Sequence, residues 1–91
     1  MSNNQERQSL EKLRSCIDEL DSELLKLLNE RAKCVIKIGK IKQKENKDIL
    51  VPLREKEVLD RLLKFNKGPM TDAMVIYLFK QIIDVLKDLQ K

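Results

Sequence analysis

The chain has 91 residues and a formal net charge of +4, from 19 Lys and Arg against 15 Asp and Glu, and it contains no histidine. The missing histidine excludes catalytic triads, zinc-dependent hydrolysis of the His-Glu-x-x-His type and histidine general-base catalysis. With 37% charged residues, 3% aromatic residues, two glycines and two prolines, the composition indicates one small all-α domain and excludes a sheet protein.

The first predicted element is a long helix over residues 9–45. The polar segment before it, residues 1–8, is expected to be flexible. Apolar residues recur along the helix in alternating steps of four and three, which is the spacing of one buried helical stripe. The first members of this stripe are Leu13, Ile17, Leu20, Leu24 and Leu27.

Two cations interrupt this stripe. The step after Leu27 lands on Arg31, and a later step, after Val35 and Ile38, lands on Lys42. An unpaired buried charge costs several kcal/mol, so both side chains predict a nearby anion. For Arg31 alone the alternatives are an ion pair within the chain, an ion pair with a partner chain, or a bound ligand.

The length of the first helix predicts a second chain. At 1.5 Å per residue the helix would be roughly 55 Å long, whereas a compact chain of this size has a radius of gyration of about 12 Å. Its own chain cannot cover such a helix. We therefore predict an intertwined homodimer whose sites draw residues from both subunits.

A second helix is predicted to follow a short break. Residues 46–48 should end the first helix and residues 49–51 form a connection. Pro52 suits the first turn of a helix that runs to about Phe65. Residues 66–69 have the sequence Asn-Lys-Gly-Pro, which should end this second helix.

The third predicted helix begins near Thr71, which can cap it, and runs nearly to the C-terminus. Its apolar face has helical spacing and comprises Val75, Ile76, Phe79, Ile82, Ile83 and Leu86. The prediction is therefore an all-α fold with three helices in a single domain over residues 9–91.

Each of the shorter helices also turns polar side chains toward its apolar side. Arg54 and Glu55 border the stripe of the second helix, and Gln90 continues that of the third. Singly, each has an ordinary structural explanation, such as a charge at a helix start or a lysine that reaches water. The whole set has more cations than local carboxylates can neutralise, which predicts a pocket for a small dianion. Its members are Arg14, Arg31, Lys42, Arg54, Glu55 and Gln90.

Other partners are not expected. The sequence has no apolar run near 18 residues and no basic-then-apolar leader, so we expect no membrane contact and a cytoplasmic location. The positive charge forms no basic run and has no aromatic platform, which argues against nucleic-acid binding. Cys16 and Cys34 lie too far apart on one helix to pair or to share a metal, so no metal site is expected.

Several blocks of residues, in order from about Leu10 to Gln90, resemble a known family. They are Leu13-Arg14, Ile17-Asp18, Leu20-Asp21, Leu27-Leu28-Asn29-Glu30-Arg31, Ile38-Gly39-Lys40-Ile41-Lys42, Arg54-Glu55-Lys56-Glu57-Val58-Leu59 and Phe79-Lys80-Gln81-Ile82-Ile83. The family is that of the all-helical chorismate mutases. Its members are intertwined dimers of three-helix chains, which agrees with the length argument.

The resemblance implies a reaction and a role for each polar residue. Chorismate would rearrange to prephenate in one unimolecular Claisen step, without nucleophile, metal or cofactor. Arg14 would reach into the partner's site, and Arg31 and Arg54 would hold substrate carboxylates. Lys42 and Gln90 would hydrogen-bond the ether oxygen. Glu55 would accept from the ring hydroxyl.

Two positions depart from the family pattern. Val51 stands where Asp is common, and Leu86 stands where Ser is common near the substrate. Val51 keeps only a backbone N–H for the substrate, and Leu86 removes a hydroxyl, which predicts either weaker binding of the substrate or a different way of binding it.

Three alternatives stay open. An isochorismate pyruvate lyase could use the same scaffold, although such enzymes commonly lack the glutamate found here at Glu55. A weakly active regulatory module is the second, because Val51 and Leu86 depart from the pattern. A helical dimerisation module whose cations pair across the interface is the third.

Overall fold

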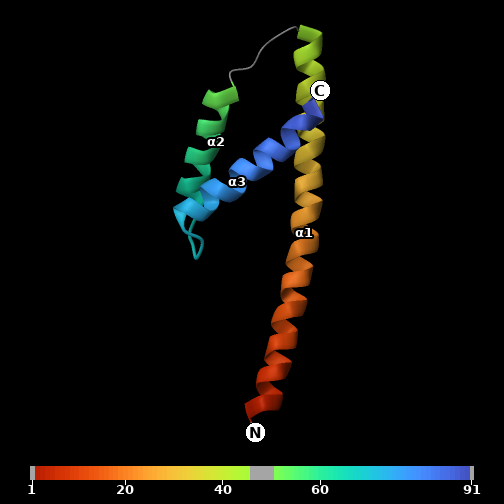
Figure 1. Cartoon of the computed structure of the whole chain (residues 1–91). Coiled ribbons are helices and arrows are strands. Elements are labelled where there is room, and N and C mark those ends of the chain that lie inside the picture. Colours follow the sequence, from red (N-terminus) through yellow and green to blue (C-terminus); the bar gives the residue numbers. More distant parts are fainter. Residues whose placement is uncertain (1, 46–50, 91) are drawn as a thin grey trace. The chain divides into compact units, whose positions relative to one another are not determined.

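The computed structural model describes residues 2–45 and 51–90 (Figure 1). These residues form three α-helices, α1 (Ser2–Glu45), α2 (Val51–Phe65) and α3 (Asp72–Lys87), followed by a 3-10 turn, η1 (Asp88–Gln90). The described ranges contain no strand, so the predicted all-α class is confirmed. Contacts within the chain divide it into two units, Met1–Lys33 and Cys34–Lys91. The second unit holds the end of α1 together with α2, α3 and η1.

Helix α1 is longer than predicted. It has 44 residues, about 66 Å at 1.5 Å per residue, and it begins at Ser2 where the sequence predicted a flexible segment through residue 8. Residues 2–8 contain neither Gly nor Pro. Once a helix is nucleated, adding residues of this kind costs little free energy, so the helix extends back to Ser2. The helix is described as far as Glu45, the residue at which the sequence predicted its end.

The helix α2 begins one residue earlier than predicted. Val51, expected in a connection, is the first helical residue, and Pro52 follows it in the first turn. A proline is tolerated there because the first backbone N–H groups of a helix have no partner within it. The terminators expected at residues 46–48 and the connection at residues 49–50 lie outside the described residues.

The start of α3 is set by its predicted cap. The Thr71 hydroxyl accepts a hydrogen bond from the Met74 backbone N–H at 3.2 Å. Before it, the Asn66 side chain accepts from the Gly68 N–H at 3.1 Å and donates to the Met70 carbonyl at 2.8 Å. Gly68 has a φ of 82°, a conformation that favours glycine. The predicted stop between the two helices is therefore correct.

In the second unit each α-helix has one buried valine. Val35, Val58 and Val75 are buried, and α2 packs on α3. The other predicted members of the apolar face of α3 are partly buried, as expected, namely Ile76, Phe79, Ile82, Ile83 and Leu86. The C-terminal end of α3 and the turn η1 that follows it carry two polar residues of interest, Lys87 and Gln90.

The first unit is a single helix whose apolar stripe is exposed. The side chains of this stripe are between 55% and 62% exposed, and they are Leu13, Ile17, Leu20, Leu24 and Leu27. None of the described helices has a stretch that is both apolar and long enough to span a membrane.

Candidate functional site

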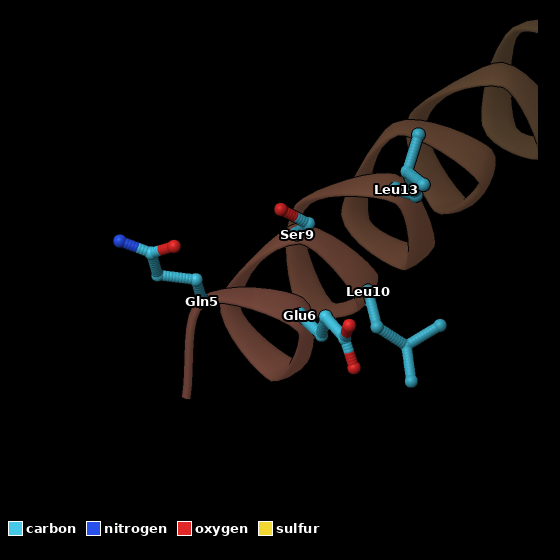
Figure 2. Close-up of a pocket in the computed structure, with 5 residues that line it drawn as sticks. All are labelled: Gln5, Glu6, Ser9, Leu10 and Leu13. Atoms are coloured by element: carbon cyan, nitrogen blue, oxygen red, sulfur yellow. The ribbon is translucent and has the colours of Figure 1, made fainter. Parts of the chain in front are cut away.

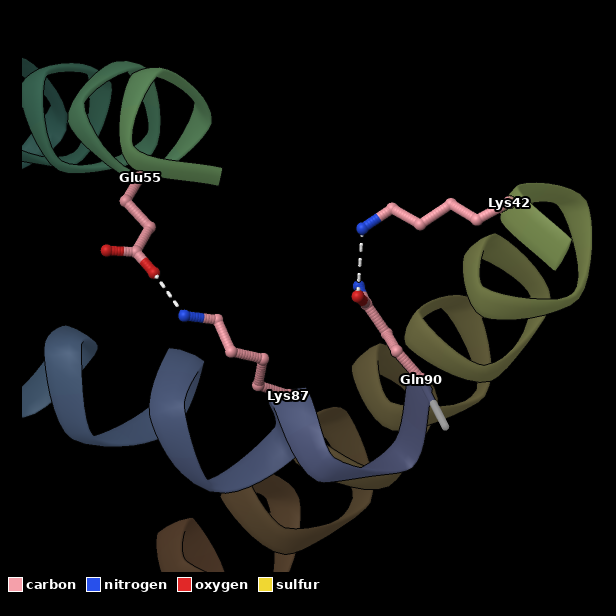
Figure 3. Close-up of polar contacts among 4 residues, drawn as sticks. All are labelled: Lys42, Glu55, Lys87 and Gln90. Atoms are coloured by element: carbon pink, nitrogen blue, oxygen red, sulfur yellow. Dashed lines mark hydrogen bonds and ion pairs between the residues drawn. The ribbon is translucent and has the colours of Figure 1, made fainter. Parts of the chain in front are cut away.

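Lys42 and Gln90 are hydrogen-bonded although they are far apart in the sequence. The Lys42 ammonium, near the end of α1, donates to the side-chain oxygen of Gln90, the last residue of η1, at 3.0 Å (Figure 3). The bond is partly buried. Because the carbonyl oxygen of the amide accepts from Lys42, its NH2 group is left as a donor. The two side chains therefore present donor groups in one place.

Gly39 makes this approach possible. A Cβ atom at this position would lie 2.6 Å from the carbonyl oxygen of Gln90 and 2.9 Å from its Cα. Both distances are shorter than van der Waals contact, so a larger residue at position 39 would push η1 away from α1. The glycine is buried. It is needed for close approach of two backbones, one turn of α1 before Lys42.

Glu55 meets a residue that the sequence analysis did not select. The Lys87 ammonium, at the end of α3, donates to one oxygen of the Glu55 carboxylate in α2 at 3.0 Å (Figure 3). This hydrogen bond raises the pKa of Lys87 above its ordinary value, and the negative charges of Glu55 and Asp84 act in the same direction while partial burial opposes them. The sequence held a signal, because Lys87 is three residues before Gln90 and so lies on the same side of the helix end.

The other predicted residues of the second unit lie apart from these two pairs. The Arg54 guanidinium lies 3.7 Å from the Glu57 carboxylate of its own helix, and both side chains are well exposed. Such a pair contributes little stability and leaves Arg54 available to a ligand. Leu86 is partly buried on α3. Val51 has a described backbone at the start of α2, and its side chain lies outside the described residues.

The two remaining cations belong to the first unit. Arg31 is partly buried and Arg14 is exposed on α1. Within residues 2–33, neither guanidinium has a carboxylate within ion-pair distance. Of the alternatives for Arg31, an ion pair inside the first unit is therefore not found.

A surface hollow on α1 does not fit a dianion. It is lined by Gln5, Glu6, Ser9, Leu10 and Leu13, all from one face of the helix (Figure 2). Its one charged group is a carboxylate, which repels anions. The part of the chain that the structure describes also holds no cluster of carboxylates and thiols suited to a metal ion, and Cys16 and Cys34 are free and exposed.

Comparison with known proteins gives consistent matches. Residues 13–91 match the family described as chorismate mutase type II. A chorismate mutase of Methanocaldococcus jannaschii is 35% identical over 85 residues, which cover 92% of this chain and 86% of that protein. A bifunctional chorismate mutase/prephenate dehydratase of Aquifex aeolicus is 40% identical over 88 residues, which cover 92% of this chain and 24% of that protein.

A similar enzyme of Escherichia coli is 37% identical over 73 residues, which cover 79% of this chain and 19% of that protein. The chain thus spans about a quarter or less of the length of these bifunctional relatives. The family match covers α1 from residue 13 on, all of α2 and α3, and the candidate residues of both units. The resemblance seen in the sequence blocks is confirmed: the chain belongs to the type II chorismate mutase family.

Proposed function

We propose that this chain catalyses the rearrangement of chorismate to prephenate. The observation that carries the proposal is the Lys42–Gln90 hydrogen bond, which holds an ammonium and an amide NH2 group together in a partly buried place. The reaction needs donors of this kind at one oxygen atom. The proposal concerns the mutase reaction alone, because the chain spans 24% of the Aquifex aeolicus bifunctional relative.

The chemistry is intramolecular. In the Claisen rearrangement the ether C–O bond breaks while a C–C bond forms within the same molecule, so no group is transferred to or from the protein. Negative charge grows on the ether oxygen as its bond breaks. Lys42 and the Gln90 NH2 group would donate to that oxygen, and one preorganised donor is worth on the order of 3 kcal/mol in the transition state.

The remaining residues would bind and orient the substrate. Arg31 and Arg54 would hold its carboxylates, because a guanidinium binds a carboxylate with two parallel hydrogen bonds. Glu55 would accept from the ring hydroxyl. Holding the substrate in a compact conformer lowers the entropic part of the barrier.

Two positions of the site are weaker than the family pattern. Val51 would offer a backbone N–H in place of a carboxylate, and Leu86 offers no hydroxyl to a substrate carboxylate. We expect a higher KM than in a chain with the usual residues. The rate of the chemical step rests on Lys42 and Gln90, which are both present.

The proposed site includes a second copy of the chain. The apolar stripe of the first unit is more than half exposed over Leu13, Ile17, Leu20, Leu24 and Leu27. A patch of this length on a single helix is costly to leave in water. We propose that an identical chain covers it in a homodimer, in which Arg14 reaches into the partner's site. We also propose that the protein is cytoplasmic, as expected from the sequence.

One assay tests the reaction. The purified chain is mixed with chorismate, loss of its ultraviolet absorbance is followed, and the product is identified by chromatography. Prephenate is the expected product. Isochorismate converted to salicylate and pyruvate would identify the lyase instead. No turnover of either substrate by a folded dimer at high protein concentration would leave a regulatory or dimerisation module as the function.

A further inference from the structure

We propose that Lys87 is a positioning residue for Glu55, holding one carboxylate oxygen so that the other can accept a hydrogen bond from the ring hydroxyl of the substrate. The inference rests on the proposed function, because it assigns Lys87 to the site in which Glu55 meets that hydroxyl. It adds a cation that the sequence pattern did not place there.

The geometry joins two helices at this point. Lys87 is the last residue of α3, and its ammonium lies 3.0 Å from Oε1 of Glu55, near the start of α2. Figure 3 shows Lys87 reaching toward α2 and Gln90 reaching toward Lys42, from the same end of the chain. A glutamate has three rotatable bonds, so an isolated Glu55 would populate several rotamers. The bond from a different helix selects one of them.

The hydrogen bond leaves Glu55 with a free acceptor. A carboxylate has two oxygens, and Lys87 occupies Oε1. The other oxygen keeps its lone pairs for a hydroxyl donor. Lys87 thus orients the carboxylate without consuming its ability to bind substrate.

Lys87 also compensates a charge problem. A carboxylate placed beside a dianionic substrate is repelled by it, and like charges near each other favour protonation of the carboxyl. The ammonium beside Glu55 offsets this repulsion. A lysine is an ammonium at neutral pH, and the hydrogen bond to Glu55 raises the pKa of Lys87 further above its ordinary value.

Another ion pair of the chain lacks these features and serves as a comparison. Lys56 and Asp60 lie 2.8 Å apart, but both are in α2, and their side chains are 74% and 54% exposed. Glu55 is 29% exposed, and its partner comes from a different helix. The Lys56 pair is a surface contact within one helix, whereas the Lys87 pair fixes a partly buried carboxylate.

The test begins with steady-state kinetics of three variants. Lys87→Met keeps most of the length of the side chain without its charge, Lys87→Arg keeps the charge, and Lys56→Met removes the comparison ion pair. We expect Lys87→Met to lower kcat/KM about tenfold, within the range found for coupled neighbours. Lys87→Arg should recover most of this loss, and Lys56→Met should behave as the unaltered chain. Equal kcat/KM in Lys87→Met and Lys56→Met would overturn the proposal.

The pH profile separates positioning from a structural role. Without the ammonium, nothing offsets the repulsion between the Glu55 carboxylate and the bound dianion, so the acid limb of kcat should move to higher pH in Lys87→Met. A merely structural role would lower activity equally at all pH values. An unmoved acid limb contradicts the proposal. If Lys87→Met does not fold, Lys87→Gln takes its place in the same measurements.

A double-mutant cycle identifies what Lys87 acts on. In a Glu55→Gln background, removing the Lys87 charge should change kcat/KM less than twofold, because the carboxylate that it positions is gone. The same loss in both backgrounds would mean that Lys87 contacts the substrate directly, which overturns the positioning role. Failure of the unaltered chain to convert chorismate removes the proposed function and this inference together, whereas activity unaffected by Lys87→Met removes the inference alone.

Discussion

In the proposed reaction, Lys42 and Gln90 would each supply a different part of the same electrostatic effect. The ammonium contributes a full charge, and the amide contributes a neutral donor whose direction is fixed by the 3.0 Å bond from Lys42 to its oxygen. A donor that is already oriented needs no reorganisation as charge develops on the ether oxygen. In the proposed reaction this pair acts on the transition state more than on the bound substrate.

We therefore expect Lys42→Ala and Gln90→Ala to lower kcat more than they raise KM. A loss on the order of 100-fold is expected for Lys42→Ala, from about 3 kcal/mol of transition-state stabilisation. The measurement is steady-state chorismate turnover by each variant. Lys40→Ala, an exposed lysine of the same helix, is the matched control. A change confined to KM would assign the pair to substrate binding.

The variant Arg31→Ala distinguishes two partners for the Arg31 guanidinium, a carboxylate of the substrate and a carboxylate of a partner chain. If the substrate carboxylate is its partner, Arg31→Ala abolishes turnover and leaves the stability of the free protein nearly unchanged. If a partner chain supplies a carboxylate, removing the guanidinium leaves a buried charge unpaired, which costs about 3 to 5 kcal/mol. Chemical denaturation of the variant alongside its activity distinguishes the two, and we expect the first result.

At the scale of the elements, the C-terminal turn η1 is held from two sides. Its Gln90 lies against Gly39 of α1 and accepts from Lys42, while Lys87, at the end of α3 just before it, reaches Glu55 in α2. Residues 87–90, which are the last residue of α3 and the three residues of η1, thus contact both α1 and α2. Changes at the contact between α1 and η1 should affect the site without touching a charged residue.

Gly39→Ala is the direct test of that contact. The added methyl group would stand 2.6 Å from the Gln90 carbonyl oxygen, so η1 must move and the Lys42–Gln90 bond lengthens. We expect kcat to fall at least tenfold, in spite of the roughly 1 kcal/mol by which alanine favours a helix over glycine. Activity equal to that of the unaltered chain would show that the approach is not needed. Ala32→Gly, at a buried position of the same helix, controls for helix propensity.

The link between α2 and α3 predicts a loss of stability at alkaline pH. The hydrogen bond to Glu55 raises the pKa of Lys87 above 10.5 in the folded chain. The folded state therefore binds this proton more tightly than the unfolded state, and the stabilisation is complete below the ordinary lysine pKa and is lost as the pH rises through the folded value. Urea denaturation of the unaltered chain and of Lys87→Met should give a difference in unfolding free energy at neutral pH that shrinks above 10.5. A difference that is independent of pH contradicts this assignment.

At the scale of the whole molecule, the first unit is the part for which we propose a partner chain. Helix propagation explains why α1 continues to Ser2, but it does not cover the apolar stripe of that half. Leu24 is 56% exposed in the single chain, and burying such a side chain stabilises an assembly by about 1.5 to 3 kcal/mol. Several leucines of this kind in line would give the proposed second copy an apolar surface to cover.

We predict that Leu24→Glu converts the dimer to a monomer and removes activity. A carboxylate in the centre of the apolar interface would be desolvated without a partner, which is strongly unfavourable. Light scattering gives the mass in solution, and the chorismate assay gives the activity. Lys26→Glu places the same side chain on the opposite side of the helix and should leave the dimer intact. Monomeric mass for the unaltered chain would contradict the homodimer outright.

The sequence by itself determined the helical class, the positions of most helix ends and the set of polar residues that border apolar faces. These properties depend on local spacing, because apolar periodicity, caps such as Thr71 and breakers such as Gly68 act within a few residues. The exceptions were also local, since the start of α1 depends on how far an already formed helix propagates. The family resemblance came from blocks of the same local kind.

Only the tertiary structure decided which of these polar residues meet. Lys42 joins Gln90, Glu55 joins Lys87, and Gly39 admits the backbone of η1, and each of these contacts links residues from different helices. Helical periodicity states which side of a helix a residue occupies but not which residue of another helix faces it. That choice follows from how the helices pack, which is why Lys87 escaped the sequence pattern and became visible in the folded chain.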